Sequence, residues 1–352
     1  MKTIARIELK PGMIAGEDIT DYNGKVLVPT GTEFTESHIA KLARHQIMAV
    51  TIKEKIDFAT THFEKVRFSD GFKKFNEDYC CYFNVYKEPI VGFLQYQMPF
   101  NIDRLMTVYE NITAAAETPE LLLDYLYNMT PSEDNMTHAH CLNSALIAGV
   151  FGKWLGLSAT DQEILIQTGF VYDIGKLRIP DSILWKTGKL DDAEREFLKK
   201  HAKMGYDMVK KLPLNVHIPF ATLQHHERID GSGYPDGLKG DAIDPFAKII
   251  AIVDTYEAMT SPRVYRQSLI PFQVIAHYEE SRGFERYDRQ ALTTILTNIA
   301  RSQIGLPVRL SDGRTAEVES INEDHLSQPV VKLDNGVLLD TAQFGVTIEA
   351  IY

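Results

Sequence analysis

Two adjacent histidines, His225 and His226, stand where an apolar stretch ends and a glycine-rich loop begins. The loop, residues 227–238, contains three glycines and a proline, so the helix cannot continue through it. Glycine also lets a backbone approach a ligand closely and adopt a positive φ. A single histidine on a helix is usually an ordinary packed residue. Two of them at the mouth of such a loop predict a binding site if other helices supply partners.

Ionisable side chains recur near the ends of the other predicted helices. Asp254 follows the apolar run of residues 249–253, where a buried carboxylate is costly unless it is paired or coordinated. Taken singly, each candidate also fits a helix cap, a surface ion pair or a satisfied core histidine. Taken together, they could bind two divalent cations about 3.5–4 Å apart, a pair that clamps a phosphate and generates hydroxide. The candidate metal ligands are His140, Asp173, His201, His225, His226 and Asp254.

Composition restricts the partners. The chain has 352 residues, enough for two or three domains, and its net charge of −11 argues against binding to DNA or RNA polymers. An anionic ligand must therefore meet a local basic cluster. Residues 1–8 carry charges where a signal peptide needs an apolar block, and no apolar stretch is long enough to cross a bilayer. The three cysteines form no disulfide framework, so we expect them reduced, mostly packed, and the protein cytoplasmic.

Hydrophobic periodicity changes along the chain and predicts a multidomain, mainly α protein with small β-rich modules at both ends. The first module is small and α/β, with a helix over residues 35–45 capped by Thr35. An aromatic stripe in the connector predicts core or interface, and its helices over 102–129 could pair with a second copy to give a homodimer. In the helical domain, we expect a buried helix over 143–155 and one uninterrupted helix over 191–212. The predicted divisions are 1–55 (N-terminal module), 56–131 (helical connector), 132–302 (helical domain) and 303–352 (β-rich module).

The candidate ligands lie within a set of motifs that resembles a known family. The motifs are Tyr172-Asp173-Ile174-Gly175-Lys176, His201, His225-His226-Glu227, Asp230-Gly231-Ser232-Gly233-Tyr234-Pro235, Asp254 and Arg263-Val264-Tyr265-Arg266. They resemble the HD-GYP family, a branch of the HD-domain phosphohydrolases whose members hydrolyse cyclic dinucleotides, chiefly cyclic di-GMP. The match covers about residues 132–300, half of the chain, and implies an HD-type helical bundle there.

The resemblance also implies roles for individual residues. The six candidates become metal ligands for one or two divalent ions, iron or manganese, with Asp173 bridging. Lys176 and Asp173 act at the scissile phosphate. Arg263 and Arg266 hold the dinucleotide phosphates, although a solvated helix end is an alternative interpretation of both. Tyr234 and Gly233 contact the substrate from the glycine-rich loop.

The sequence departs from the family pattern at two positions and therefore leaves two functional predictions open. Tyr172 stands where the family has the histidine of its His-Asp pair, which weakens the position that uses His140 and Asp254. Met136 stands where some relatives have an acidic ligand, so we expect no third metal. One prediction is a phosphodiesterase that opens a cyclic dinucleotide to a linear product. The alternative is a degenerate member that binds the nucleotide, or a diguanylate cyclase partner through the loop, without turnover.

Overall fold

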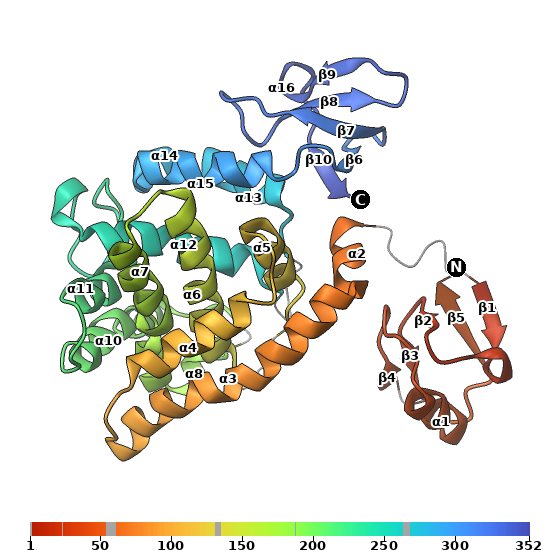
Figure 1. Ribbon diagram of the computed structural model, residues 1–352, viewed down its shortest axis with the longest axis horizontal. Helices are drawn as coiled ribbons and strands as arrows, with labels where there is room; N and C mark the ends of the chain where they lie inside the picture. The colour runs from red at the N-terminus through yellow and green to blue at the C-terminus, as the bar shows by residue number, and fades with distance from the viewer. Residues whose placement is uncertain (1, 23, 54–60, 131–134, 187, 263–267) are drawn as a thin grey trace. The chain divides into compact units, whose positions relative to one another are not determined.

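The computed structural model contains two compact units, Met1–Phe68 and Ser69–Tyr352 (Figure 1). The fold is mainly helical with small sheets near each end of the chain, which confirms the predicted class. The finer division at residues 55, 131 and 302 stays a prediction. Among the described residues, no helix combines the length and apolar character needed to cross a membrane. The described residues are 2–22, 24–53, 61–130, 135–186, 188–262 and 268–352.

The N-terminal unit is a small α/β module. Its antiparallel sheet has the order β1-β5-β2, and β3 pairs with β4. Helix α1 begins after Thr35, whose hydroxyl accepts a hydrogen bond from the backbone N–H of His38 at 3.2 Å, so the predicted helix and cap are confirmed. Val28, Phe34 and Leu42 form the centre of its core. Its elements are β1 (Lys2–Ala5), η1 (Arg6–Glu8), β2 (Ile14–Ala15), β3 (Ile19–Thr20), β4 (Val26–Val28), α1 (Glu36–Arg44), β5 (Ala49–Lys53) and α2 (His62–Phe68).

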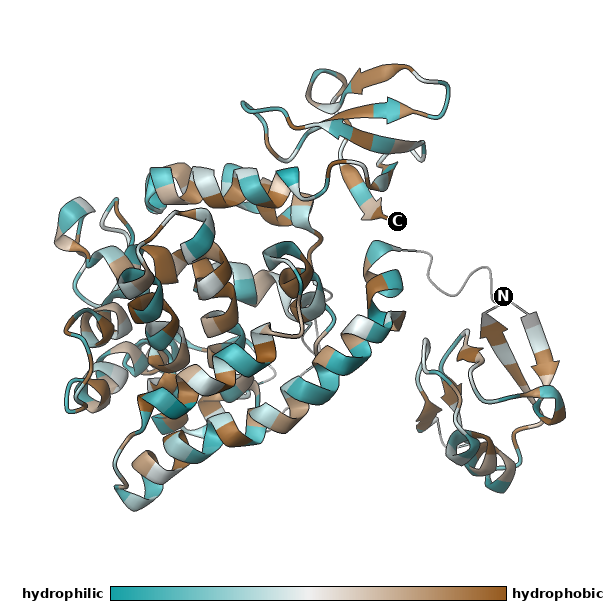
Figure 2. Ribbon diagram, in the orientation of Figure 1, coloured by the Kyte–Doolittle hydropathy of each residue, from teal (hydrophilic) through white to brown (hydrophobic). Residues whose placement is uncertain are grey.

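The aromatic stripe lies on α3 (Asp70–Tyr96), which begins the second unit and is followed by α4 (Ile102–Thr113) and α5 (Pro119–Tyr127). The Tyr79 hydroxyl donates to Asn143 Oδ1 at 2.7 Å, and the Tyr86 hydroxyl donates to the Phe170 carbonyl at 3.2 Å. These rings therefore belong to the core of the second unit. Hydrophilic and hydrophobic residues alternate along α3, as expected of a helix with one buried side (Figure 2).

The same helix corrects the prediction for the cysteines. All three are free, but Cys80 and Cys81 are exposed on α3, and only Cys141 is buried. The expectation that they are mostly packed is therefore wrong, because the buried side of α3 is occupied by its aromatic rings.

Helix α6 is the centre of the bundle and packs against α7 and α12. Every residue from Cys141 to Gly152 is buried, which confirms the predicted buried helix. The side chains of Ser158 and Asp244 cap α7 and α12 by accepting hydrogen bonds from backbone N–H groups of the first turn. The elements of the bundle are α6 (Met136–Trp154), α7 (Ala159–Val171), η3 (Ile174–Arg178), α8 (Asp181–Leu184), α9 (Asp192–Lys199), α10 (His201–Val209), α11 (His217–Gln224), η4 (Gly240–Ala242) and α12 (Pro245–Thr260).

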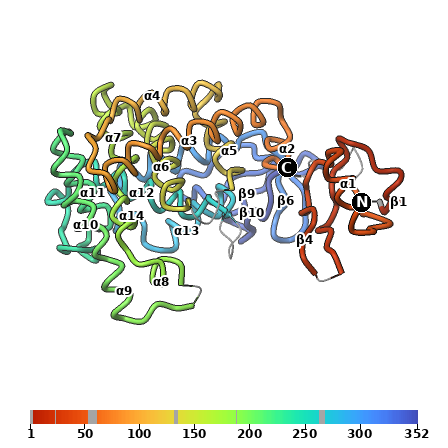
Figure 3. Tube along the Cα trace, turned by 90° about the horizontal axis from the view of Figure 1, so that it is seen from below, coloured from red at the N-terminus to blue at the C-terminus, as the bar shows by residue number. Residues whose placement is uncertain are grey.

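The predicted uninterrupted helix over 191–212 is wrong, because α9 ends at Lys199 and α10 begins at His201. Figure 3 shows α9 leaving the bundle together with α8. The Nδ1 atom of His201 lies 2.7 Å from the carbonyl oxygen of Leu198, so the imidazole satisfies a carbonyl at the break. His201 is thus the first residue of a helix, not an interior one.

After α13 (Pro271–Glu280), α14 (Gly283–Arg286) and α15 (Arg289–Arg301), the chain forms a five-stranded antiparallel sheet of order β10-β6-β7-β8-β9. A small β-rich module is therefore present at this end of the chain, as the sequence predicts. The sequence interpretation missed the last strand and the short helix before it. The elements are β6 (Pro307–Leu310), β7 (Thr315–Ser320), β8 (Val330–Leu333), β9 (Leu338–Asp340), α16 (Thr341–Phe344) and β10 (Ile348–Ile351).

Candidate metal centre

The structure brings all six candidate ligands into one region of the bundle, in two groups of three. In each group, one nitrogen or carboxylate oxygen from every member lies within 4.8 Å of the others. We call His201, His225 and His226 the imidazole group. We call His140, Asp173 and Asp254 the carboxylate group.

In the imidazole group, two ring nitrogens face each other in a way that calls for a cation. Nδ1 of His201 lies 2.7 Å from the Leu198 carbonyl, and Nδ1 of His225 lies 2.8 Å from the Thr222 carbonyl. A carbonyl only accepts, so both Nδ1 atoms carry the proton and both Nε2 atoms present lone pairs. These Nε2 atoms are 3.2 Å apart. Two lone pairs at that distance repel each other unless a positive ion lies between them.

Burial keeps these imidazoles neutral, as metal ligands must be. Loss of solvation lowers the pKa of both His201 and His225 to about 4, and it lowers the pKa of His226 further below its ordinary value. His226 also stacks on Tyr234, with ring centres 4.6 Å apart and an interplanar angle of 25°. The loop tyrosine therefore supports the imidazole group directly.

Asp173 lies between the two groups. Its Oδ1 is 3.4 Å from Nε2 of His201, and its Oδ2 is 3.4 Å from Nε2 of His140. The carboxylate is fully buried, and neither oxygen has a hydrogen bond of ordinary geometry from a described residue. An anion in this condition is stable only beside positive charge. Lys176 provides some, with Nζ 2.5 Å from Oδ2 as an ion pair.

Lys176 remains a cation in this setting. Burial by itself would lower its pKa, but the charges of Asp173 and Asp254 outweigh that effect and raise it. The ammonium lies one turn after Asp173 and lines the same cavity, so it can meet an anionic ligand there.

A close approach of two backbones sets this geometry. A Cβ added to Gly175 would lie 1.9 Å from the carbonyl oxygen of His201, so only glycine lets η3 rest on the start of α10. This contact holds Asp173, two residues before Gly175, beside His201.

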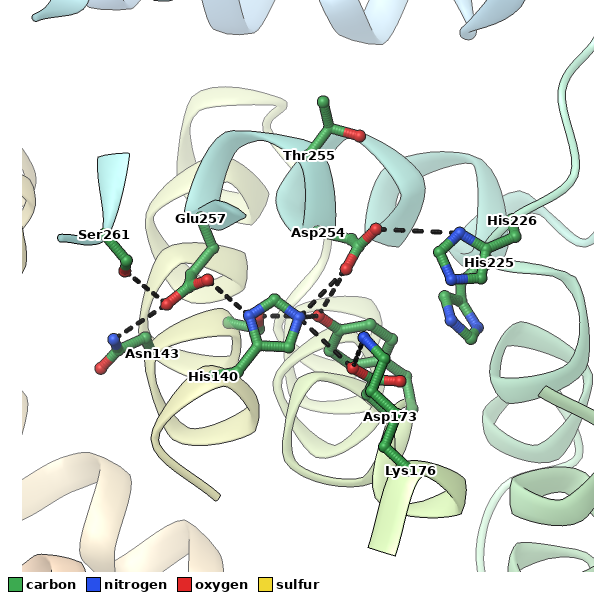
Figure 4. Close-up of polar contacts among 12 residues, drawn as sticks. His140, Asn143, Asp173, Lys176, His225, His226, Asp254, Thr255, Glu257 and Ser261 are labelled. Carbon is green, nitrogen blue, oxygen red and sulfur yellow. Dashed lines mark hydrogen bonds and ion pairs between the residues drawn. The ribbon is translucent and has the colours of Figure 1, made fainter. Parts of the chain in front are cut away.

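In the carboxylate group, His140 is held at both ring nitrogens. Its Nδ1 is 2.5 Å from Oε2 of Glu257, and its Nε2 is 3.1 Å from Oδ1 of Asp254 (Figure 4). Glu257 and Asp254 raise the pKa of His140 to about 9 even though burial opposes this. At neutral pH, protons therefore compete with a metal ion for this imidazole.

The sequence interpretation missed Glu257. This buried carboxylate also accepts hydrogen bonds from Asn143 Nδ2 at 3.1 Å and from the Ser261 hydroxyl at 2.5 Å. It lies three residues after Asp254 on the same apolar helix, so the two carboxylates share a face. That spacing is the signal that could have identified it.

Tyr172 contacts the carboxylate group through its hydroxyl. Its fully buried hydroxyl lies 2.5 Å from Nε2 of His140, 3.1 Å from Oδ1 of Asp254 and 3.1 Å from the hydroxyl of Ser144. Burial, reinforced by the charges of Asp254 and Asp173, raises the pKa of Tyr172 well above its ordinary value. The side chain is a neutral phenol that hydrogen-bonds to the very atoms a metal would use.

The glycine-rich loop is organised by Glu227, which directly follows the two histidines. Its carboxylate accepts hydrogen bonds from the backbone N–H groups of Asp236, Gly237 and Leu238, at 2.7, 3.1 and 3.0 Å. Gly233 is required by packing within the loop, because a Cβ there would lie 2.4 Å from Cα of Glu227. Tyr234 and Gly233 thus have structural roles, and their contact with substrate stays a prediction.

Two further predicted residues, Arg263 and Arg266, lie outside the described residues. Met136 lines the cavity beside His140.

The donor atoms fit divalent metal ions. The imidazole group offers nitrogen ligands with free lone pairs, and Asp173 adds a buried carboxylate without ordinary hydrogen bonds. Nitrogen and oxygen donors of this kind suit iron, manganese or zinc, and they do not select among them.

Comparison with known proteins agrees with this geometry. Residues 121–291 match the model of the HD domain. The chain is 35% identical over 171 residues to the cyclic di-GMP phosphodiesterase response regulator RpfG of Xanthomonas campestris. The aligned residues cover 48% of this chain and 45% of that protein. It is 38% identical over 174 residues to the 3'3'-cGAMP-specific phosphodiesterase 1 of Vibrio cholerae, covering 49% of this chain and 40% of that protein.

The helical domain contains an HD domain. A solved structure, that of Bd1817, a HDG"Y"P protein from Bdellovibrio bacteriovorus, shares the fold, with a TM-score of 0.51 and 13% identity over 85% of this chain and 99% of that one. The chain spans less than half the length of the two phosphodiesterases above. Tyr172 and Asp173 lie within the residues that match the HD domain.

Proposed function

We propose that this protein hydrolyses a cyclic dinucleotide, cyclic di-GMP foremost, to a linear product with the help of bound divalent metal. The observation that carries the proposal is the pair of facing Nε2 atoms of His201 and His225, 3.2 Å apart, beside the buried Asp173 carboxylate, whose Oδ1 lies 3.4 Å from Nε2 of His201. Relatives that share this domain act on cyclic di-GMP and on 3'3'-cGAMP, which supports the substrate class.

The residues divide into two roles. His201, His225, His226 and Asp173 would hold one ion of iron or manganese, with Asp173 directing its other oxygen to the carboxylate group. When bound, the metal polarises the phosphate and lowers the pKa of an attacking water. Lys176 contributes a fixed positive charge that meets the scissile phosphate or its leaving oxygen. Arg263 and Arg266 are assigned to the remaining phosphate of the dinucleotide.

A second function is favoured by Tyr172. Because its phenol hydrogen-bonds to both His140 and Asp254, the second metal position is weakened, and the protein would then bind the nucleotide without turnover. In that case, the glycine-rich loop could instead bind a diguanylate cyclase domain, and a homodimer would be compatible with either role.

The deciding experiment measures hydrolysis of cyclic di-GMP and of 3'3'-cGAMP by purified protein loaded with Mn²⁺ or, without oxygen, Fe²⁺. Turnover by the native chain that is lost in His225→Ala supports the enzyme. Turnover only in Tyr172→His, together with nucleotide binding by the native chain, supports the binding role. Absence of nucleotide binding in calorimetry would contradict both.

A further inference from the structure

The cavity at the metal centre has two chemically different sides. It has a volume of about 220 Å³. Among its lining residues, we call His140, Asp173 and Lys176 the polar side and Leu184, Trp185 and Leu198 the apolar side. The apolar side comes from α8, the residue after it, and α9, the segment that leaves the bundle in Figure 3.

On the apolar side, the exposed indole of Trp185 has no evident role in packing the fold. Its side chain is 40% exposed, and no described aromatic ring or cation packs on the indole. The other tryptophan, Trp154, stacks on Phe151 with ring centres 5.6 Å apart and an interplanar angle of 22°. The indole of Trp154 therefore packs on another ring, whereas the indole of Trp185 is partly exposed at the cavity.

The two sides match the two parts of a nucleotide. The metal-competent side, where Lys176 adds a positive charge, suits a phosphate, and an exposed indole suits a base, which has a π face whatever its identity. Ligand pockets commonly measure about 300–1,000 Å³, so a cavity of about 220 Å³ accommodates part of a cyclic dinucleotide. It suits the scissile phosphate and one adjoining base, with the second base outside.

We propose that Trp185 is a substrate-binding residue on which one base of the cyclic dinucleotide stacks, while the adjoining phosphate lies at Asp173 and Lys176. The proposal rests on the proposed function for its ligand class. Because stacking tolerates either purine, Trp185 strengthens binding of cyclic di-GMP and of 3'3'-cGAMP alike and does not choose between them.

The test uses metal-loaded full-length protein and a phosphorothioate analogue of cyclic di-GMP that resists hydrolysis. The chain has two tryptophans, so Trp154→Phe leaves Trp185 as the only indole reporter. We expect the analogue to quench its fluorescence in a saturable way. We also expect Trp185→Ala to weaken binding by about 5- to 150-fold, the equivalent of about 1–3 kcal/mol for one stacked base, and Trp185→Phe to recover most of the loss.

Phe220→Ala is the matched control, since this aromatic side chain is 39% exposed on α11 and does not line the cavity. Metal content and thermal unfolding of each variant show whether the fold is intact. With the native substrate, Trp185→Ala should raise KM and leave kcat nearly unchanged, because stacking acts on ground state and transition state alike.

The stacking role is wrong if Trp185→Ala binds the analogue as tightly as the native protein does and the analogue does not quench the Trp154→Phe reporter. The proposed function stands in that case, because the native protein still binds the analogue. If the native protein fails to bind the analogue at all, the proposed function falls, and the role of Trp185 falls with it.

Discussion

The two ligand groups that meet at Asp173 are built from similar residues but are in opposite electrostatic states. In the imidazole group, burial outweighs the attraction of the nearby carboxylates and lowers the pKa of His201 and His225 to about 4, which leaves their Nε2 atoms unprotonated. In the carboxylate group, Glu257 and Asp254 raise the pKa of His140 to about 9, and Tyr172 hydrogen-bonds to its Nε2. A ligand set is therefore defined by what its lone pairs already contact as much as by residue type.

The largest effect should come from the imidazole group. His225→Ala removes one of the two facing lone pairs, so we expect loss of the tightly bound ion and of all measurable turnover. Metal content by mass spectrometry and hydrolysis of cyclic di-GMP measure this. His277→Ala, an exposed histidine on α13, is the control and should change neither. Full metal retention in His225→Ala would mean that the carboxylate group, and not the imidazole group, is the principal metal site.

Glu257→Gln tests how the carboxylate group is held. The variant loses the charge that orients and polarises His140, and partners of this kind typically contribute about 10–100-fold to metal affinity or activity. At alkaline pH, we expect the metal affinity of Glu257→Gln to be lower than that of the native protein by about this factor. An unchanged affinity would show that Glu257 serves only the fold.

The same variant has a distinct pH signature. Metal binding to His140 requires the neutral ring, so binding at this position strengthens as pH rises toward about 9. Removing the Glu257 charge lowers the pKa of His140, and the midpoint of metal binding should move to lower pH. A calorimetric titration of metal binding across pH measures both changes, and a midpoint that stays in place would contradict the role of Glu257.

The smallest effect, a gain, should come from Tyr172→His. It replaces a hydrogen-bonding phenol by an imidazole, so we expect the second position to fill, with affinity rising by at least about tenfold, the lower end of what partners of metal ligands contribute. Tyr172→Phe is the matched control, because it removes the hydroxyl and supplies no ligand. The metal-to-protein ratio of the three proteins separates the outcomes. An equal ratio in all three would show that Tyr172 does not limit the second position.

Individual residues show which parts of the site could be predicted from the sequence. The six candidate ligands were predicted near helix ends, except for His201, which was expected inside the helix over 191–212, and Asp254 in an apolar helix, and they do converge. Glu257 was missed although its i,i+3 spacing from Asp254 is visible in the sequence. The break at Lys200 had no such signal, since α9 and α10 share one helical periodicity, and it is stabilised by the contact of His201 with Leu198.

The sequence by itself determined the helical class, the β-rich ends and the residues able to hold metal, because periodicity, turn residues and ligand types are local properties of the chain. Only the tertiary structure decided which ring nitrogens have free lone pairs, that Tyr172 contacts both His140 and Asp254, and that Trp185 lines the cavity of Lys176. Those features depend on distances between segments far apart in sequence. Such distances are set by how the helices pack, as at Gly175 against His201, and no local pattern encodes them.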